Sequence, residues 1–232
     1  MDEAQYQFLR NIFLSLLLSI SLLLSSQYVL AVDLSRTTHM ALHFQTQKLN
    51  LNFSGDIRKT RFYSVDLVIR ERLTERLDGA VLLGHVTTDQ SSNPILAGQD
   101  TTGGYAGLDL RYKLIDTHRY DLLTRAAYQY SETEANIEDQ DIIWEWHQAQ
   151  FDLINRFNIS NNLYINLGAT AYDLDGREKA SGTLDQNTDF DAKDGIYGHL
   201  SLQFNLDYSG QIDLEVYIGS IEGGRIAFHR AF

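Results

Sequence analysis

The strongest constraint on this chain is an alternation of apolar and polar residues with a period of two that recurs along most of its length. In residues 63–69, one phase is entirely apolar and the other is largely polar. The same pattern returns in residues 105–114, 163–171, 196–206 and 212–218. Alternate side chains of a β-strand point to opposite faces, so this periodicity predicts an all-β chain of amphipathic strands.

The length of these runs and the spacing between them favour a membrane barrel over a soluble sandwich. Many runs approach ten residues, which is the length a tilted strand needs to cross a bilayer, whereas soluble strands average about five or six. Closure into a barrel leaves no unpaired backbone edge in the hydrocarbon. Short connections, near 74–78, 115–118, 158–161 and 207–210, alternate with long polar ones, near 90–103, 132–141 and 175–194. This asymmetry is typical of antiparallel up-and-down transmembrane barrels.

The pattern predicts ten strands, with both ends of the barrel domain on the same side of the membrane. The predicted strands are 47–55, 61–73, 79–89, 104–114, 119–131, 143–157, 162–174, 195–206, 211–220 and 224–232. The first segment is ambiguous, because residues 40–44 are apolar at even positions and residues 49–53 at odd positions. A β-bulge or an extra hairpin would shift the phase in this way, so eight and twelve strands remain alternatives.

The N-terminus carries an apolar run of thirteen residues, 12–24, which is too short for a membrane helix and suits the core of a secretory signal. Small residues at 29–31 predict cleavage, so that residues 1–31 are a signal peptide and 32–232 are the barrel domain. An uncleaved anchor is the alternative, because the leading segment has one basic residue, Arg10, beside Asp2 and Glu3. The absence of cysteine excludes disulfides and thiolate metal sites.

The export signal, the amphipathic strands, the loop lengths and the terminal Phe232 together resemble small bacterial outer-membrane β-barrel proteins of the OmpA and OmpX type. The resemblance implies an integral outer-membrane location, both termini in the periplasm, and lipid and lipopolysaccharide as surroundings. It also implies insertion by the barrel-assembly machinery, which reads a C-terminal aromatic signal, here Phe228 and Phe232. No cofactor motif is found, and the formal net charge of −12 argues against nucleic acid as a partner.

The polar phase of the strands carries charges of both signs. In a barrel of eight to ten strands, side chains largely fill the lumen, and charges buried there must pair. We therefore predict a filled polar lumen with a salt-bridge network, and a narrow channel for ions or small solutes as the alternative. The predicted network is Asp66, Arg70, Asp109, Arg111, Lys113, Arg125, Asp152, Arg156, Asp213, Glu215 and Arg225.

One group on the interior phase suggests catalysis. His199 and Ser201 lie on one strand, and a short turn brings Glu215 back beside them, which are the parts of a hydrolase. The group is similar in outline to the His-x-Ser and Glu arrangement of outer-membrane lipid A deacylases. Gln203 departs from that family's local pattern, and all three side chains face the lumen, away from a lipid substrate. We therefore predict a non-enzymatic barrel with a structural or surface-interaction role, and a lipid A-modifying or other hydrolase as the alternative.

The predicted outer loops are acidic. Asp185, Asn187, Asp189 and Asp191 imitate the start of a calcium loop, but Phe190 and Ile196 stand where that loop needs glycine and glutamate. We predict no built metal site there. With Glu132, Glu134, Glu138, Asp139 and Asp141, these residues form an acidic rim, for which weak binding of calcium or magnesium is a hypothesis.

Trp144 and Trp146 share the phase opposite to the apolar face of their strand. Two placements fit this phase. The side chains either point inward or stand above the membrane, where they could stack on carbohydrate.

Overall fold

The computed structural model describes residues 38–90, 93, 96, 98–137, 139–192 and 195–232. The predicted signal peptide, residues 1–31, and Glu138 lie outside the described residues. Nowhere in the described part is there a helix with the length and apolar content to cross a bilayer. The strands are β1 Thr38–Phe53, β2 Asp56–Arg72, β3 Leu77–Asp89, β4 Thr101–Asp116, β5 Tyr120–Ile137, β6 Gln140–Ser160, β7 Leu163–Gly182, β8 Gln186–Ala192, β9 Ile196–Asn205, β10 Gly210–Gly219 and β11 Glu222–Ala231.

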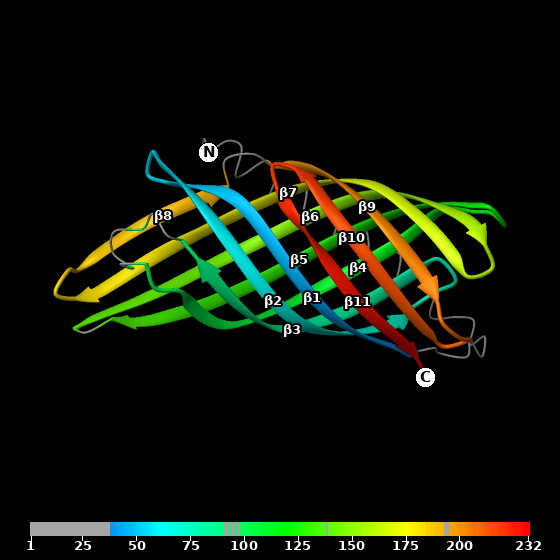
Figure 1. The fold of residues 1–232 in the computed structure, drawn as a ribbon, viewed down its shortest axis with the longest axis horizontal. Coiled ribbons are helices and arrows are strands. Elements are labelled where there is room, and N and C mark those ends of the chain that lie inside the picture. Colours follow the sequence, from blue (N-terminus) through cyan, green and yellow to red (C-terminus); the bar gives the residue numbers. More distant parts are fainter. Residues whose placement is uncertain (1–37, 91–92, 94–95, 97, 138, 193–194) are drawn as a thin grey trace, which may run out of the picture. The chain divides into compact units, whose positions relative to one another are not determined.

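Ten of these strands form a closed antiparallel barrel (Figure 1). Each ring strand pairs with the next, and the ring closes where β11 pairs with β1 over His39–Lys48. The predicted count of ten is confirmed, and the alternatives of eight and twelve are wrong. We call the end at which β1 begins and β11 ends the terminal end.

The eleventh strand, β8, was not predicted. It pairs with Asp175–Ala180 of β7 and with Leu51–Phe53 of β1. Nearer the terminal end, β9 and β11 occupy these two pairing positions. Strand β8 therefore closes the far part of the ring in place of β9, β10 and β11.

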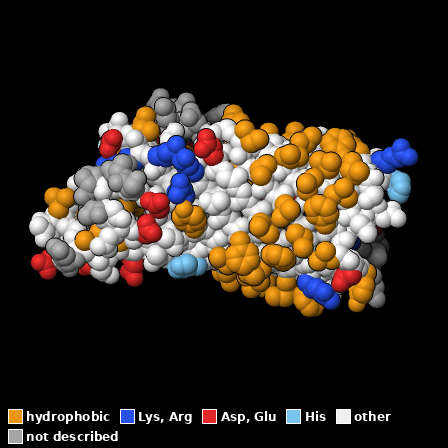
Figure 2. Space-filling model, in the orientation of Figure 1, with side chains coloured by type: hydrophobic (Ala, Val, Ile, Leu, Met, Phe, Trp, Pro, Cys, Tyr) orange, Lys and Arg blue, Asp and Glu red, His pale blue; other side chains and the backbone are white. Residues whose placement is uncertain are grey.

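Exposed apolar side chains lie all around the terminal half of the barrel, and we call this surface the belt. Figure 2 shows one face of it. Its members include Leu42, Phe44, Val65, Leu67, Leu83, Leu108, Phe151, Leu153, Leu200, Leu214, Ile226 and Phe228. Exposed aromatic residues border it on both sides, as in the interfacial girdles of membrane barrels. They are Tyr63, Tyr128 and Tyr130 on the far side and Tyr112, Phe157, Tyr208 and Phe232 on the terminal side.

Beyond the belt the barrel continues as a part that we call the head, built from residues 49–61, 131–146 and 173–192. Here the apolar side chains turn inward and form a buried cluster, the head core, which also includes residues of the adjoining parts of the barrel. It comprises Leu49, Leu51, Phe53, Phe62, Val86, Leu96, Tyr105, Ala135, Ile142, Trp144, Trp146, Tyr172, Leu174, Ala180, Phe190, Tyr197, Tyr217 and Ile221. The belt is thus apolar outside, and the head is apolar inside.

Strand β1 contains this reversal without any break. Its pairing with β2 is continuous from Thr38↔Glu71 to Phe53↔Asp56, so the predicted bulge or extra hairpin is wrong. Phe44 points out and is 44% exposed, whereas Phe53 points in and is 2% exposed. The apolar phase changes because the strand passes from a belt surrounded by lipid to a head surrounded by water.

The same change of surroundings explains two loops that were predicted wrongly. Residues 132–141 and 175–194 are mostly strand, belonging to β5, β6, β7 and β8. Strands β5, β6 and β7 run for 18, 21 and 20 residues. Their outward side chains in the head are polar, which gave these segments the composition of loops.

The terminal strand supports a prediction about assembly. Phe228 and Phe232 point outward, and the backbone N–H of Phe232 donates to Thr38 O at 2.9 Å across the β11–β1 seam. Arg230 lies between them at the rim, with Nη1 3.5 Å from Asp207 Oδ2, where an arginine costs about 0 to 1 kcal/mol. Deleting Phe232 is therefore expected to lower the folded fraction more than Arg230→Ala does. Heat-modifiable migration on gels measures this fraction, and equal values for the two variants would refute the expectation.

Candidate functional site

The terminal half of the lumen holds a cavity of about 330 Å³, which we call the lumen pocket. Toward the head it ends against Leu49, Phe62 and Trp146, which are buried members of the head core. Toward the terminal end it reaches Arg72 and Lys113, whose side chains are 46% and 30% exposed. The pocket thus meets buried apolar side chains toward the head and partly exposed charged side chains toward the terminal end.

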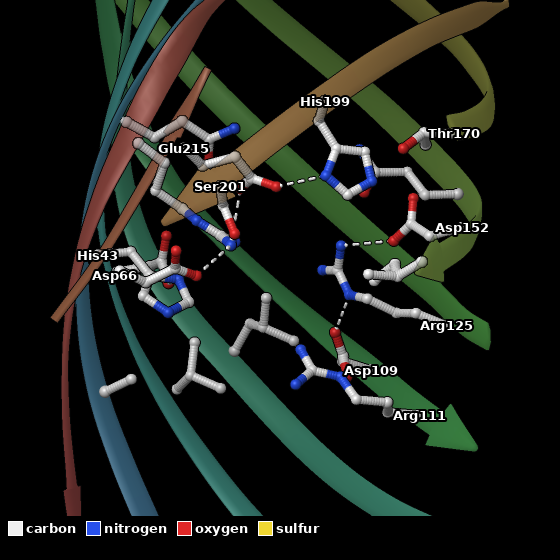
Figure 3. A pocket seen from close by; sticks show the side chains of 18 of the residues that line it. His43, Asp66, Asp109, Arg111, Arg125, Asp152, Thr170, His199, Ser201 and Glu215 are labelled. Carbon is white, nitrogen blue, oxygen red and sulfur yellow. Dashed lines mark hydrogen bonds and ion pairs between the residues drawn. The ribbon is translucent and has the colours of Figure 1, made fainter. Parts of the chain in front are cut away.

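All eleven residues of the predicted lumen network line this pocket. Asp109 is at the centre and is 2% exposed. Its carboxylate is 3.1 Å from Arg70 Nη2 and also accepts a hydrogen bond from Arg125 Nε. Arg125 Nη1 in turn donates to Asp152 Oδ2 at 2.9 Å (Figure 3). Charged side chains from β2, β4, β5 and β6 therefore form one connected chain, which offsets part of the cost of burying them.

A second group of charges comes from β9, β10 and β11. Glu215 binds Arg225 Nη2 at 2.8 Å and His199 Nδ1 at 2.7 Å, and Asp213 lies 3.7 Å from Arg225. The register explains this arrangement, because Glu215 stands directly opposite Arg225 on β11 and Ser201 on β9.

A third group includes residues that sequence reasoning missed. Asp66 binds His43 Nδ1 at 2.9 Å and accepts a hydrogen bond from Tyr105 Oη at 2.7 Å. His43 lies in the segment of uncertain phase, so its inward direction could not be read. Tyr105 reaches Asp66 across Gly84, where a Cβ atom would collide with the tyrosine ring.

The catalytic candidates are close together but are not joined as a triad. His199 is bound by Glu215, whereas Ser201 Oγ accepts a hydrogen bond from Asn166 Nδ2 at 2.7 Å. The other ring nitrogen of His199 lies over Gly168 on β7, where a Cβ atom would collide with it. Figure 3 marks no interaction between His199 and Ser201. Ser201 is thus held by a hydrogen bond from Asn166, and His199 by its contact with the Glu215 carboxylate.

The predicted calcium-loop residues do not surround a common point. Asn187, Asp189 and Asp191 are alternate residues of strand β8, whose extended backbone spreads them along one face. Asp189 Oδ1 accepts a hydrogen bond from Arg177 Nε at 2.8 Å, and Asp185 Oδ1 accepts one from Gly182 N in the turn. Among the described residues, no group of three or more histidine or carboxylate side chains is placed to hold a metal ion.

The acidic rim lies on the outside of the head. Glu132 and Glu134 are outward residues of β5, and Asp139 and Asp141 lie at the β5–β6 turn.

The two tryptophans point inward within the head, and the exposed fractions of Trp144 and Trp146 are 0% and 2%. A carbohydrate-stacking role at an exposed surface is therefore excluded by their burial.

Sequence reasoning also missed a buried carboxylate that contacts the head core. Glu178 on β7 is 1% exposed and accepts hydrogen bonds from Trp144 Nε1 at 2.8 Å and Asn93 Nδ2 at 2.6 Å. Asn93 belongs to the connection between β3 and β4, so Glu178 ties this connection to the wall of the head. Its inward phase on β7 was readable only once the strand was known to continue to Gly182.

Comparison with known proteins places the fold. No protein-family model matches the chain, and no curated protein matches it. The translocator domain of the autotransporter NalP from Neisseria meningitidis matches with a TM-score of 0.51 and 10% identity, covering 99% of this chain and 98% of that one. The outer membrane protease OmpT from Escherichia coli matches with a TM-score of 0.50 and 8% identity, covering 88% and 99%. The β domain of the Bordetella autotransporter BrkA matches with a TM-score of 0.50 and 12% identity, covering 84% and 99%. The chain thus has the antiparallel barrel fold of bacterial outer-membrane proteins, as its sequence predicted.

Proposed function

We propose that this chain is an integral, non-enzymatic protein of a bacterial outer membrane, with a sealed lumen and a head that projects from the cell surface to contact partners. The reversal of the apolar face carries this proposal. A belt that is apolar outside suits lipid, whereas a head that is polar outside and apolar inside suits water. The solved structures of similar fold support the outer membrane as its location.

The packing of the head core supports a sealed lumen. Phe53, Trp144 and Phe190 have ring centroids 4.9 to 5.6 Å apart, and Leu51 and Ile142 beside them are fully buried. A hydrated ion would have to displace these packed rings in order to pass. The packing therefore favours a closed barrel over the narrow channel.

The orientation is tested by labelling introduced cysteines, because the chain has none of its own. Asn136→Cys places a thiol at the exposed tip of the β5–β6 hairpin, and Glu75→Cys places one in the exposed β2–β3 turn at the terminal end. A membrane-impermeant maleimide is expected to label Asn136→Cys on intact cells and Glu75→Cys only after the outer membrane is permeabilised. The reverse order, or labelling of both on intact cells, would contradict the proposed orientation.

The hydrolase alternative gives a separate prediction. Ser201 is hydrogen-bonded by Asn166 inside the lumen, where the barrel wall separates it from membrane lipid. Replacing Ser201 by alanine is therefore expected to leave the acylation pattern of lipid A unchanged. Mass spectra of lipid A from cells with the wild-type and variant proteins provide the measurement, and a new acyl chain pattern in the variant would support the hydrolase.

A further inference from the structure

The charges that line the lumen pocket do not all pair with one another, and Arg111 is one cation that has no carboxylate partner among the described residues. Arg111 is on β4 and lines the pocket. Its Nε is buried without a hydrogen-bond partner, and no ion pair joins it to any residue that the structure describes. In Figure 3, dashed lines join Arg125 to Asp109 and to Asp152, but none reaches Arg111.

The surroundings of Arg111 are mainly cationic. The charged residues near it include Arg70, Arg125 and Arg225, and the carboxylates of Asp109 and Asp213. Both Arg70 and Arg125 already bind the Asp109 carboxylate. In the β4–β5 pairing, moreover, Arg111 stands directly opposite Arg125. A guanidinium with a buried Nε in such surroundings is costly unless an anion neutralises it.

Further polar and cationic groups connect Arg111 with the terminal end. Arg156 lines the same pocket, and its Nε donates to a neutral amide, Asn166 Oδ1, at 3.1 Å. Lys113, two residues after Arg111 on the same face, is 30% exposed and also lines the pocket. Asp78 stands opposite Arg111 on β3, but its Oδ1 lies 3.8 Å from Arg72 Nε. An anion entering from the terminal end would therefore meet cations along the way to Arg111.

We infer that the lumen pocket binds a small free oxyanion against Arg111, either inorganic phosphate or a small metabolite with a phosphate or carboxylate group. The planar guanidinium offers such a group two parallel hydrogen bonds. The volume of about 330 Å³ leaves room for more than the anionic group itself, because it is within the range of small-molecule pockets. The barrel wall and the head core leave the terminal end as the entrance. This site is independent of the proposed surface role and of whether the lumen conducts.

Calorimetry on the folded protein in detergent tests the inference with inorganic phosphate as the probe. Ionic strength is held constant with sodium chloride, so that general screening does not change during the titration. Saturable binding with a Kd of about 1 mM or lower is expected for the wild type. Arg111→Gln is expected to weaken phosphate binding on the order of tenfold, because the positive charge and the two parallel N–H donors of the guanidinium are both lost. The matched control is Arg76→Gln, which removes the same charge from the exposed β2–β3 turn and should leave Kd unchanged.

Three results would overturn the inference. They are the absence of saturable phosphate binding by the wild type at tens of millimolar, equal weakening by Arg111→Gln and Arg76→Gln, and full affinity in Arg111→Gln. Heat-modifiable migration confirms that each variant is folded before it is titrated. If Arg111→Gln does not fold, Arg156→Gln takes its place, with a several-fold weaker affinity expected and an unchanged affinity contradicting the inference.

Discussion

Replacing Asp109 by asparagine is expected to destabilise the folded barrel by about 3 to 5 kcal/mol, the usual cost of removing one partner from a buried ion pair. Asp109 is 2% exposed and is the shared acceptor for Arg70 and Arg125. The asparagine keeps the shape of the side chain but removes its charge, which leaves these arginines and Arg111 to repel one another. Urea unfolding in lipid bilayers, followed by tryptophan fluorescence, measures the free energy of unfolding.

The matched control for this variant is Asp116→Asn on the same strand. Asp116 is 51% exposed and its partner is Lys113, so its loss is expected to change stability by less than about 0.5 kcal/mol. Adding Arg111→Gln to Asp109→Asn should recover part of the lost stability, because one repelling cation is removed. Equal stabilities for Asp109→Asn and Asp116→Asn would show that the network does not hold the barrel together.

Replacing Phe53 by alanine is expected to destabilise the head by about 3 to 5 kcal/mol, the range for a buried phenylalanine. Its ring lies among Trp144, Phe190 and the guanidinium of Arg58, whose Cζ is 4.5 Å from the ring centroid. The variant leaves a cavity that these neighbours can fill only partly. Both tryptophans of the chain lie in the head, so their fluorescence reports unfolding of this part directly.

Phe44→Ala on the same strand is the control for Phe53→Ala. Phe44 is 44% exposed on the belt, and lipid can fill the space of its ring. The expected cost is then the transfer free energy alone, about 1.5 to 3 kcal/mol, without a cavity contribution. A larger loss of stability for Phe44→Ala than for Phe53→Ala would mean that the assignment of belt and head is wrong.

The belt half of the fold was predictable because lipid and lumen impose opposite demands on alternate residues. Val65 and Asp66 illustrate this, since the first is 42% exposed on the belt and the second is 3% exposed in the lumen. An apolar side chain is stable against lipid, and a charged side chain is stable in the lumen where it has buried partners. The period of two therefore identifies both the strand and its two faces.

The head was not predictable from the same pattern. The alternation continues there, but the apolar side chains point into the barrel, whereas in the belt they point outward. Leu49 and Leu51 on β1 appeared to signal a bulge, although the strand is regular and only its surroundings change. Strand β8 was missed for a related reason. Asp189 and Asp191 on its outward face are typical of a loop, and the buried Phe190 between them is a single apolar residue.

The site was predictable as a set of residues but not as a set of contacts. The two-residue alternation identified Arg111, Arg125 and Asp109 as inward-facing, because the face of a side chain depends only on its position along the strand. The choice of partners depends on register and on side-chain reach across the lumen. Register and reach place the Asp109 carboxylate against Arg125 and Arg70, and they leave Arg111 without a carboxylate partner in the described part of the chain.

Conductance of the purified protein in planar lipid bilayers tests the sealed lumen most directly. The lumen pocket ends against the head core, in which Trp144 and Leu51 are both fully buried. Wild-type protein, shown to be folded and inserted, is expected to give no unitary current steps in molar potassium chloride. Steady steps whose size rises with salt concentration would contradict the sealed barrel and establish a channel through the head.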